Sequence, residues 1–235
     1  MKMLAKYYDN VYRINDAQIV LDLLHRSGGP LLDLGCGTGR TLVSAFAEGF
    51  SVIGIDFDQD MLDVAKSKLD ELPKTNGSFD LIYGNMQNTD LSQYKFGTIV
   101  SMANTFSLIL TAEDRIATLK RHALLLKDNG FMLFPVLNFL PPSGERVTNV
   151  DTDEGNLEFK VRWELKGDKR IFSLSLDLNK NSERYQFETA VLPPDKFLPE
   201  IHASGLELES LHGDLQKGTL DSKSPFWVYT LKKIN

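Results

Sequence analysis

A glycine-rich turn between a strand and a helix constrains this 235-residue chain more than any other segment. Residues 33–39 read Asp-Leu-Gly-Cys-Gly-Thr-Gly, after a short apolar run that predicts a buried strand over 30–34. A helical pattern over about 40–48 follows directly. Glycine permits positive φ and lets the backbone approach a ligand closely. In a parallel α/β sheet, such a turn lies at the carboxyl edge of the strands, where ligands bind.

Strands and helices alternate along the first part of the chain. Further strands are predicted at 51–56, 79–83, 98–103 and 131–137, with helices at 10–26, 59–71, 111–127 and 194–204. Asp58 and Thr111 are placed to cap the helices that follow them. This alternation predicts an α/β fold with a doubly wound, mostly parallel, Rossmann-like sheet of seven strands. Residues 206–211 and 226–231 are expected to complete the sheet as an edge hairpin.

The pattern changes after residue 140. Residues 157–165, 170–178 and 183–191 alternate apolar and polar side chains with no helix between them, which predicts a small antiparallel β insertion. The chain is therefore divided into a core, residues 1–140 and 192–235 with an N-terminal cap helix, and an insertion at 141–191. The insertion is too small to fold alone and is expected to pack against the main sheet.

Composition excludes several classes of function. The net charge of −6 argues against a nucleic-acid-binding surface. Cys36 is the single cysteine, so an intrachain disulfide and a paired-cysteine zinc site are ruled out, and the four histidines lack ligand-like spacing. The longest apolar run, residues 131–140, is short of the roughly 18 residues that cross a bilayer. We therefore expect a cytoplasmic protein with no metal, nucleic-acid or membrane partner.

The spacing of the glycines bears on the ligand. The dinucleotide fingerprint G-x-G-x-x-G would need a glycine where Arg40 stands. The observed G-x-G-x-G, preceded by an acid, resembles motif I of the class I S-adenosylmethionine (SAM)-dependent methyltransferases. SAM carries an ammonium group and no phosphate, so an acid beside the turn suits it. The resemblance implies that the cofactor-binding residues of the turn are Asp33, Gly35, Cys36, Gly37, Thr38 and Gly39.

Asp56 ends the second predicted strand. An acid about 20 residues after a glycine turn is placed to accept hydrogen bonds from a ribose diol. We interpret Asp56 as that acid; the alternative is a strand-end acid without a ligand.

The resemblance covers residues 31–140. The segment after Asp56 is similar to the family's adenine-flanking segment, which implies cofactor contacts from Phe57 and Met61. Gly-Asn-Met at 84–86 resembles the third motif, where Asn85 replaces the usual acid and Met86 follows it. The amide oxygen of Asn85 retains the acceptor for the adenine amino group but lacks its charge.

The end of the fourth strand, residues 101–106, matches the family's segment next to the transferable methyl group. This implies that Met102 contacts the cofactor. Asn104 and Thr105 are then candidate catalytic residues that contact the acceptor, with helix capping as the alternative.

The flanks resemble small-molecule methyltransferases, namely the sugar N,N-dimethyltransferases and, more broadly, glycine N-methyltransferase. The lead at 7–12, Tyr-Tyr-Asp-Asn-Val-Tyr, implies that Tyr8 and Tyr12 cover the cofactor; packing of the first helix is the alternative. The insertion at 141–191 would lie over the acceptor pocket. His212 is a candidate proton acceptor, with a structural turn as the alternative.

These features predict SAM-dependent methyl transfer to a small-molecule acceptor, at nitrogen, with catalysis mainly by positioning. A non-catalytic SAM-binding module and a nucleotide-cofactor oxidoreductase are the alternatives. A monomer or homodimer is expected. Four arginines of the insertion are candidates for holding an anionic substrate, or are simply solvated: Arg146, Arg162, Arg170 and Arg184.

Overall fold

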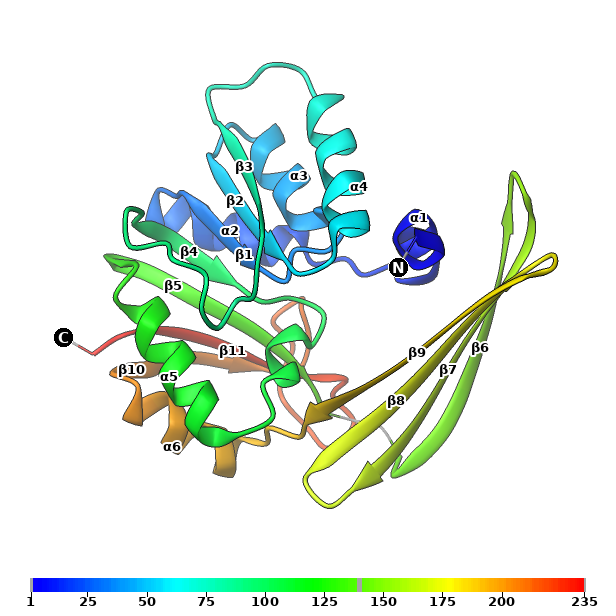
Figure 1. Cartoon of the computed structure of the whole chain (residues 1–235). Helices are drawn as coiled ribbons and strands as arrows, with labels where there is room; N and C mark the ends of the chain where they lie inside the picture. Colours follow the sequence, from blue (N-terminus) through cyan, green and yellow to red (C-terminus); the bar gives the residue numbers. More distant parts are fainter. Residues whose placement is uncertain (1, 139–140, 235) are drawn as a thin grey trace.

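A computed structural model describes residues 2–138 and 141–234 of the chain (Figure 1). Its core is a sheet with the strand order β10-β11-β5-β4-β1-β2-β3. The strands are β1 (Leu31–Leu34), β2 (Val52–Asp56), β3 (Phe79–Tyr83), β4 (Phe96–Val100), β5 (Leu126–Leu137), β10 (Leu206–His212) and β11 (Phe226–Lys233). The first five pair in parallel, and β10 and β11 are antiparallel to their neighbours. The predicted seven-stranded, mostly parallel sheet is confirmed.

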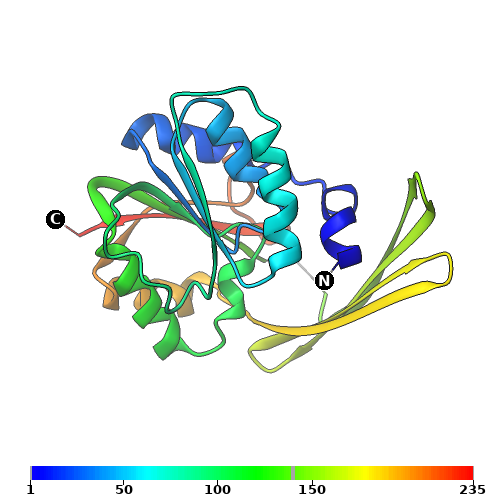
Figure 2. The same ribbon diagram turned by 45° about the horizontal axis from the view of Figure 1, so that its top comes forward.

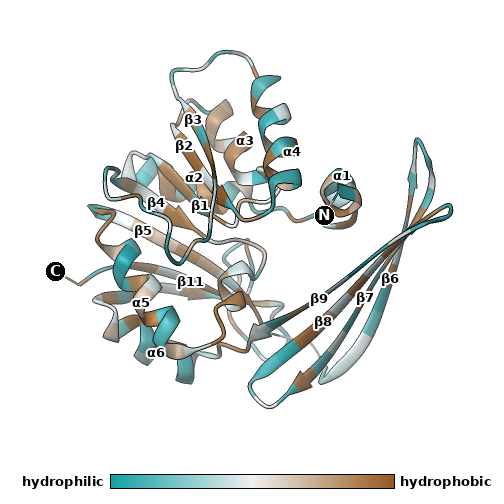
Figure 3. Cartoon of the chain, viewed as in Figure 1, coloured by the Kyte–Doolittle hydropathy of each residue, from teal (hydrophilic) through white to brown (hydrophobic). Residues whose placement is uncertain are grey.

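Helices cover both faces of this sheet. One apolar cluster joins the sheet to α2 (Ala17–Ser27), α3 (Arg40–Ala47) and α4 (Gln59–Asp70). A second joins the other face to α5 (Ala112–Ala123) and α6 (Pro194–Ala203). The central strands are buried on both faces, which is why they read as continuous apolar runs and appear brown in Figure 3. Their carboxyl ends therefore meet at one edge of the sheet.

A second sheet stands apart from the first. It contains β6 (Ser143–Thr152), β7 (Gly155–Lys166), β8 (Lys169–Leu178) and β9 (Asn181–Ala190), all antiparallel. Helix α1 (Lys2–Val11) lies between this sheet and the core in both Figure 1 and Figure 2. Its buried residues Leu4 and Tyr7 share an apolar cluster with Phe159 and Leu176 of the sheet. The second sheet thus buries part of its inner face on α1.

Three expectations differ from the structure. The insertion has four strands rather than three. The sequence pattern does not indicate β6, because most of its side chains are exposed and do not alternate between apolar and polar. Its inner face packs mainly on α1, and the main sheet adds Leu137, at the end of β5, to the same apolar cluster. The helix expected at 10–26 begins at Ala17, and α5 ends at Ala123, after which β5 begins at Leu126 and passes through the expected Asp-Asn-Gly stop.

The capping predictions are confirmed. The Asp58 side chain accepts hydrogen bonds from the backbone N–H groups of Asp60 and Met61 at the start of α4. The Thr111 hydroxyl accepts one from Asp114 N (3.1 Å) at the start of α5. Among the described residues, no helix is long and apolar enough to cross a membrane.

Replacing Thr111 with alanine removes the acceptor of that N-terminal bond. We expect the free energy of unfolding of this variant, measured by urea denaturation, to be about 1 kcal/mol lower than that of the wild type. Thr111→Ser is the matched control, since serine keeps the hydroxyl acceptor. Equal losses in the two variants would contradict the capping role.

Candidate functional site

The glycine turn between β1 and α3 is built from three residues in the left-handed region. Gly35, Gly37 and Gly39 have φ values of +77°, +54° and +75°. A Cβ atom on Gly35 would lie 2.4 Å from Thr105 Cγ2, and one on Gly39 would lie 2.9 Å from Ala65 Cβ. A Cβ atom on Gly37 would meet nothing within 4 Å. The flanking glycines are therefore required by close packing, whereas open space lies beside Gly37.

Asp56 holds this turn from the end of β2. Its Oδ2 accepts a hydrogen bond from Gly37 N (2.7 Å), and its Oδ1 accepts one from Asp58 N (2.9 Å). The side chain is only 8% exposed, and burial raises the pKa of its carboxyl group. Each carboxylate oxygen has two acceptor positions. Both oxygens therefore retain capacity for a ligand hydroxyl while they fix the backbone of the turn.

Asp33 is buried beneath the same turn, 2% exposed. The Thr41 hydroxyl donates to its Oδ2, but its Oδ1 is buried without a hydrogen-bond partner. Burial raises the pKa of Asp33 to about 7. A buried acceptor without a partner is costly. This oxygen is thus available to a donor group that a ligand brings.

A small cavity of about 30 Å³ lies at the turn. Its lining includes Asp33, Gly35, Cys36, Gly37, Thr38, Arg40 and Met102. Burial raises the pKa of the Cys36 thiol well above its usual value, so this cysteine is not a reactive thiolate. Arg40 donates from Nε (2.9 Å) and Nη2 (2.6 Å) to the buried carboxylate of Asp16, which leaves Nη1 outside that pair.

A large cavity of about 1260 Å³ lies between the core, α1 and the second sheet. Phe57, Met61 and Asn104 line it from the core side. Tyr8, Ala103 and Thr105 line both cavities, so the two meet at these residues. The site is therefore a small polar cavity at the turn that adjoins a much larger chamber.

Helix α1 is tied to the glycine turn and to α4. Asp9 Oδ1 accepts from Thr38 Oγ1 (2.8 Å), and its Oδ2 pairs with Lys68 of α4. The ring of Tyr8 lies 4.8 Å from that of Tyr12, which in turn lies 5.3 Å from Phe159 on β7. Tyr8 of α1 and Tyr12, just after its end, thus both line the chamber and also pack against each other.

The end of β4 places Asn104 and Thr105 at the junction of the cavities. Asn104 has φ +67°, and its Oδ1 accepts hydrogen bonds from Leu137 N (2.9 Å) and Ser107 Oγ (2.9 Å). Its side-chain oxygen therefore holds the start of the 3₁₀ helix η1 (Thr105–Leu108) against the end of β5. Thr105 contacts both cavities.

Other predicted residues lie outside both cavity linings. The Asn85 side chain is exposed, and its Oδ1 accepts from Gln87 N (2.9 Å) within its own turn, while Met86 packs against the core. His212 is paired with Val228 between β10 and β11, away from the chamber. Asp56 lies between two lining residues, Gly37 and Phe57, without lining either cavity itself.

Sequence reasoning missed two polar pairs. In the sequence, Arg40 bears only on the dinucleotide pattern, and Asp16 falls inside the helix predicted at 10–26. The structure places Asp16 before α2 as the partner of Arg40. Asp9 follows Tyr8 directly in the segment 7–12. Its partner Lys68 is 59 residues away in the chain, so a single sequence does not indicate the pair.

Comparison with known families gives a match at the glycine turn and the strands around it. Residues 31–130 match the model of a methyltransferase domain. The putative methyltransferase YqeM of Bacillus subtilis is 29% identical over 110 residues, which are 46% of this chain and 42% of the relative. The matched region therefore spans less than half of that curated relative.

Two solved structures resemble nearly the whole chain. The CcbJ methyltransferase from Streptomyces caelestis has a TM-score of 0.84 at 19% identity, over 99% of this chain and 96% of the other. CalS10 from Micromonospora echinaspora, described as a SAM-bound amino pentose methyltransferase, has a TM-score of 0.72 at 16% identity, over 97% and 96%. At these identities the likeness establishes the fold, second sheet included.

Proposed function

We propose, because residues 31–130 match the model of a methyltransferase domain, that the protein is a SAM-dependent methyltransferase that methylates a small molecule at nitrogen. The observation that carries the proposal is the meeting of a small polar cavity at the glycine turn with a large chamber, at Tyr8, Ala103 and Thr105. One cavity suits the polar end of the methyl donor, and the other has room for an acceptor.

The residues at the turn fit the charged groups of SAM. The Oδ1 of Asp33, which has no hydrogen-bond partner among the described residues, provides an acceptor for the ammonium group, and the Nη1 of Arg40, outside its pair with Asp16, provides a donor for the carboxylate. Asp56 keeps acceptor capacity for the ribose hydroxyls while it holds the turn. The open space beside Gly37 lets the donor approach the backbone.

When bound, SAM would supply a methyl group on a sulfonium centre. A nucleophile in line with the C–S bond can take the methyl group, and the sulfur keeps the electron pair of that bond and becomes a neutral thioether. The chain's part is to hold the acceptor at the junction of the cavities and to exclude water there. Thr105 and Ala103 form the wall of that junction, and Tyr8 on α1 closes it from the opposite side. Such positioning supplies several kcal/mol of rate enhancement.

The chamber favours nitrogen as the acceptor atom. Among the described residues, its lining contains no His, Glu, Lys or Cys side chain, and its single acid, Asp151, lies on the outer face of β6 and accepts a hydrogen bond from Asn156 Nδ2 (2.9 Å). Burial raises the pKa of Tyr8 to about 12, and that of Tyr12 is also raised, so neither phenol is an effective base near neutral pH. A neutral amine attacks through its own lone pair and needs no base, whereas a hydroxyl acceptor usually needs one.

Calorimetry tests the donor half of this proposal. We expect SAM and S-adenosylhomocysteine to bind with a stoichiometry near one, and NADH not to bind. A screen of small amines and matched alcohols, read by S-adenosylhomocysteine release, tests the acceptor half. Donor binding without turnover of any amine would favour a non-catalytic SAM-binding module, and binding of NADH alone would favour the oxidoreductase.

A further inference from the structure

The arginines on the two faces of the second sheet differ in whether they form ion pairs with carboxylates. On the outer face, Arg162 pairs with Glu145 and Arg184 pairs with Asp177. On the inner face, the strand register places Arg146 opposite Val161, and Arg170 opposite Thr189. Among the described residues, neither of these inner-face arginines has a carboxylate within ion-pair distance.

The one carboxylate of the inner face that could neutralise them is already engaged. Glu183 accepts hydrogen bonds from Met3 N (3.1 Å) and Leu4 N (3.4 Å) at the start of α1, and from the Tyr185 hydroxyl. It therefore serves the end of the helix rather than an arginine. Asp151, the only acid in the described lining of the chamber, lies on the alternate face of β6 and accepts from Asn156 Nδ2 (2.9 Å).

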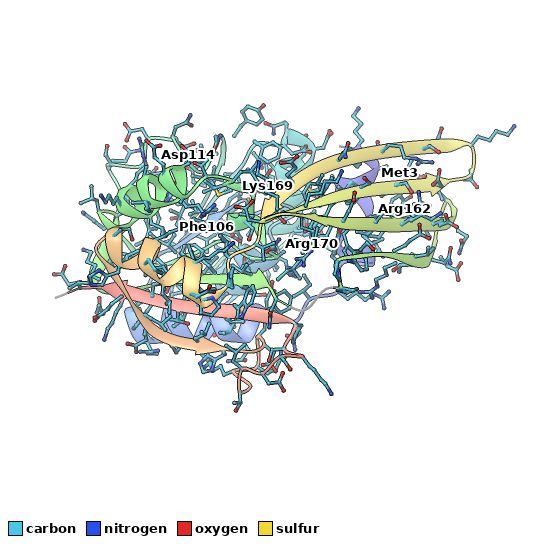
Figure 4. All side chains as sticks on the ribbon, turned by 90° about the horizontal axis from the view of Figure 1, so that it is seen from below. Met3, Phe106, Asp114, Arg162, Lys169 and Arg170 are labelled. Atoms are coloured by element: carbon cyan, nitrogen blue, oxygen red, sulfur yellow. The ribbon has the colours of Figure 1, made fainter. Side chains whose placement is uncertain are left out.

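Arg170 shows that the missing partner is costly. Its side chain is 4% exposed, and its Nε is buried without a hydrogen-bond partner. Figure 4 shows Arg170 at the base of the second sheet, close to the core, and Arg162 farther along the sheet. A buried charge without compensation is unfavourable, so the inner face is electrostatically incomplete in the free protein.

Arg13, just after α1, adds a second positive charge to that of Arg146. Both line the chamber, and neither has an ion-pair partner among the described residues, whereas Arg184, which also lines it, is paired with Asp177. The whole chain has a net charge of −6, so this accumulation runs against its general balance. The charged side chains of the described lining are three arginines and one acid, Asp151, so the chamber carries an excess of positive charge and attracts ligands of the opposite sign.

An aromatic row lies on the inner face between Arg146 and Arg170. The register aligns Gly144, Trp163, Phe172 and Phe187 across the four strands. Phe172 and Phe187 are stacked with their ring centroids 5.3 Å apart, and the Trp163 indole lies over Gly144, where a Cβ atom would be 2.4 Å from its ring. Trp163, Phe172 and Phe187 all line the chamber, so their rings form an aromatic platform on this face.

We propose, on the basis of the function proposed above, that the methyl acceptor is an anionic molecule whose ring lies on the Trp163–Phe172–Phe187 platform and whose carboxylate or phosphate is bound by Arg146 with Arg13. Arg170 strengthens the positive potential of the same face from the base of the sheet. Arg146 and Arg13 then receive in the complex a counter-charge that no described residue supplies in the free protein.

The test uses probes that differ in charge at constant shape. Benzoate, phenyl phosphate and neutral benzamide are titrated by calorimetry into the full chain, with and without S-adenosylhomocysteine. We expect benzoate or phenyl phosphate to bind at least about tenfold more tightly than benzamide, since charge-assisted bonds to arginine are the strong ones. The comparison of benzoate with phenyl phosphate identifies the anionic group. Failure of both anions to bind more tightly than benzamide would overturn the proposal.

A pair of variants assigns the effect to the inner face. Arg146→Gln is expected to remove the preference for the anion, while Arg162→Gln, on the outer face of the neighbouring strand, is expected to retain it. Both side chains are exposed, so neither variant should unfold. Equal losses in the two variants would contradict the assignment. Binding of S-adenosylhomocysteine in the same samples reports on the donor site separately, so a failure there counts against the proposed function and not against the anion preference.

Discussion

Replacing Asp56 with alanine should weaken SAM binding by about 1.5–3 kcal/mol, or about 10- to 150-fold, the cost of losing hydrogen bonds to a charged group. Besides the proposed loss of a ribose contact, the structure gives a second reason for weaker binding. The variant also leaves Gly37 N and Asp58 N without their acceptor, so the turn that receives the donor loses a fixed backbone. Calorimetric titration of SAM into the wild type and the variant measures the effect.

Asp56→Asn separates the two contributions. Asparagine offers one acceptor oxygen, while two backbone N–H groups face the two carboxylate oxygens, so one of those bonds is lost and the affinity should still fall. Asp80→Asn, an exposed acid on the adjacent strand β3, is the matched control and should bind SAM like the wild type. Unchanged affinity in a folded Asp56→Ala protein would remove Asp56 from the site.

SAM affinity should rise steeply with pH because of Asp33. Burial raises the pKa of this carboxyl group to about 7 in the free protein, so it is largely protonated in mildly acidic solution. An ammonium group binds the ionised form. Affinity is therefore expected to increase about tenfold per pH unit below about pH 7, and to level off once Asp33 is ionised. Titrations between about pH 5 and pH 7.5 measure this slope, and a flat profile would exclude Asp33 as the ammonium partner.

The same group should mark the stability of the free protein. The pKa of Asp33 is higher in the folded state than its ordinary value of 3.8, so folding takes up a proton between these two pH values. The stability that this group contributes is present below its unfolded pKa and is lost as pH rises through about 7. Asp33→Asn should remove this component from the thermal midpoint and flatten the SAM profile, whereas Asp80→Asn should change neither.

The motif residues near the glycine turn were predictable because their order along the chain determines their position. A strand, a tight turn and a helix in sequence place Asp33 and the three glycines at the carboxyl edge of the sheet, whatever lies elsewhere. The parallel pairing of β1 with β2 then places Asp56 next to that turn, as its spacing from the glycines predicts. Local rules also predicted the caps at Asp58 and Thr111.

The residues that define the chamber were not predictable in the same way. Strand β6 carries few buried side chains, so only its pairing with β7 reveals it, and with it the inward position of Arg146. Asn85 fits the motif pattern, yet a local turn uses its side-chain oxygen. His212 is the last residue of β10, paired with Val228 of β11, and lies outside both cavity linings.

The core sheet, the glycine turn and the acids beside it could be predicted from the sequence, because each follows from periodicity and from short-range backbone geometry. Only the packed structure shows that α1 lies between the core and the second sheet and that Asp9, Thr38 and Lys68 meet there. It also shows that Arg13 and Arg146 line the chamber with no ion-pair partner among the described residues. Those relations join residues far apart in the chain, and their energies depend on burial and on the absence of a counter-charge, which exist only once the elements are packed.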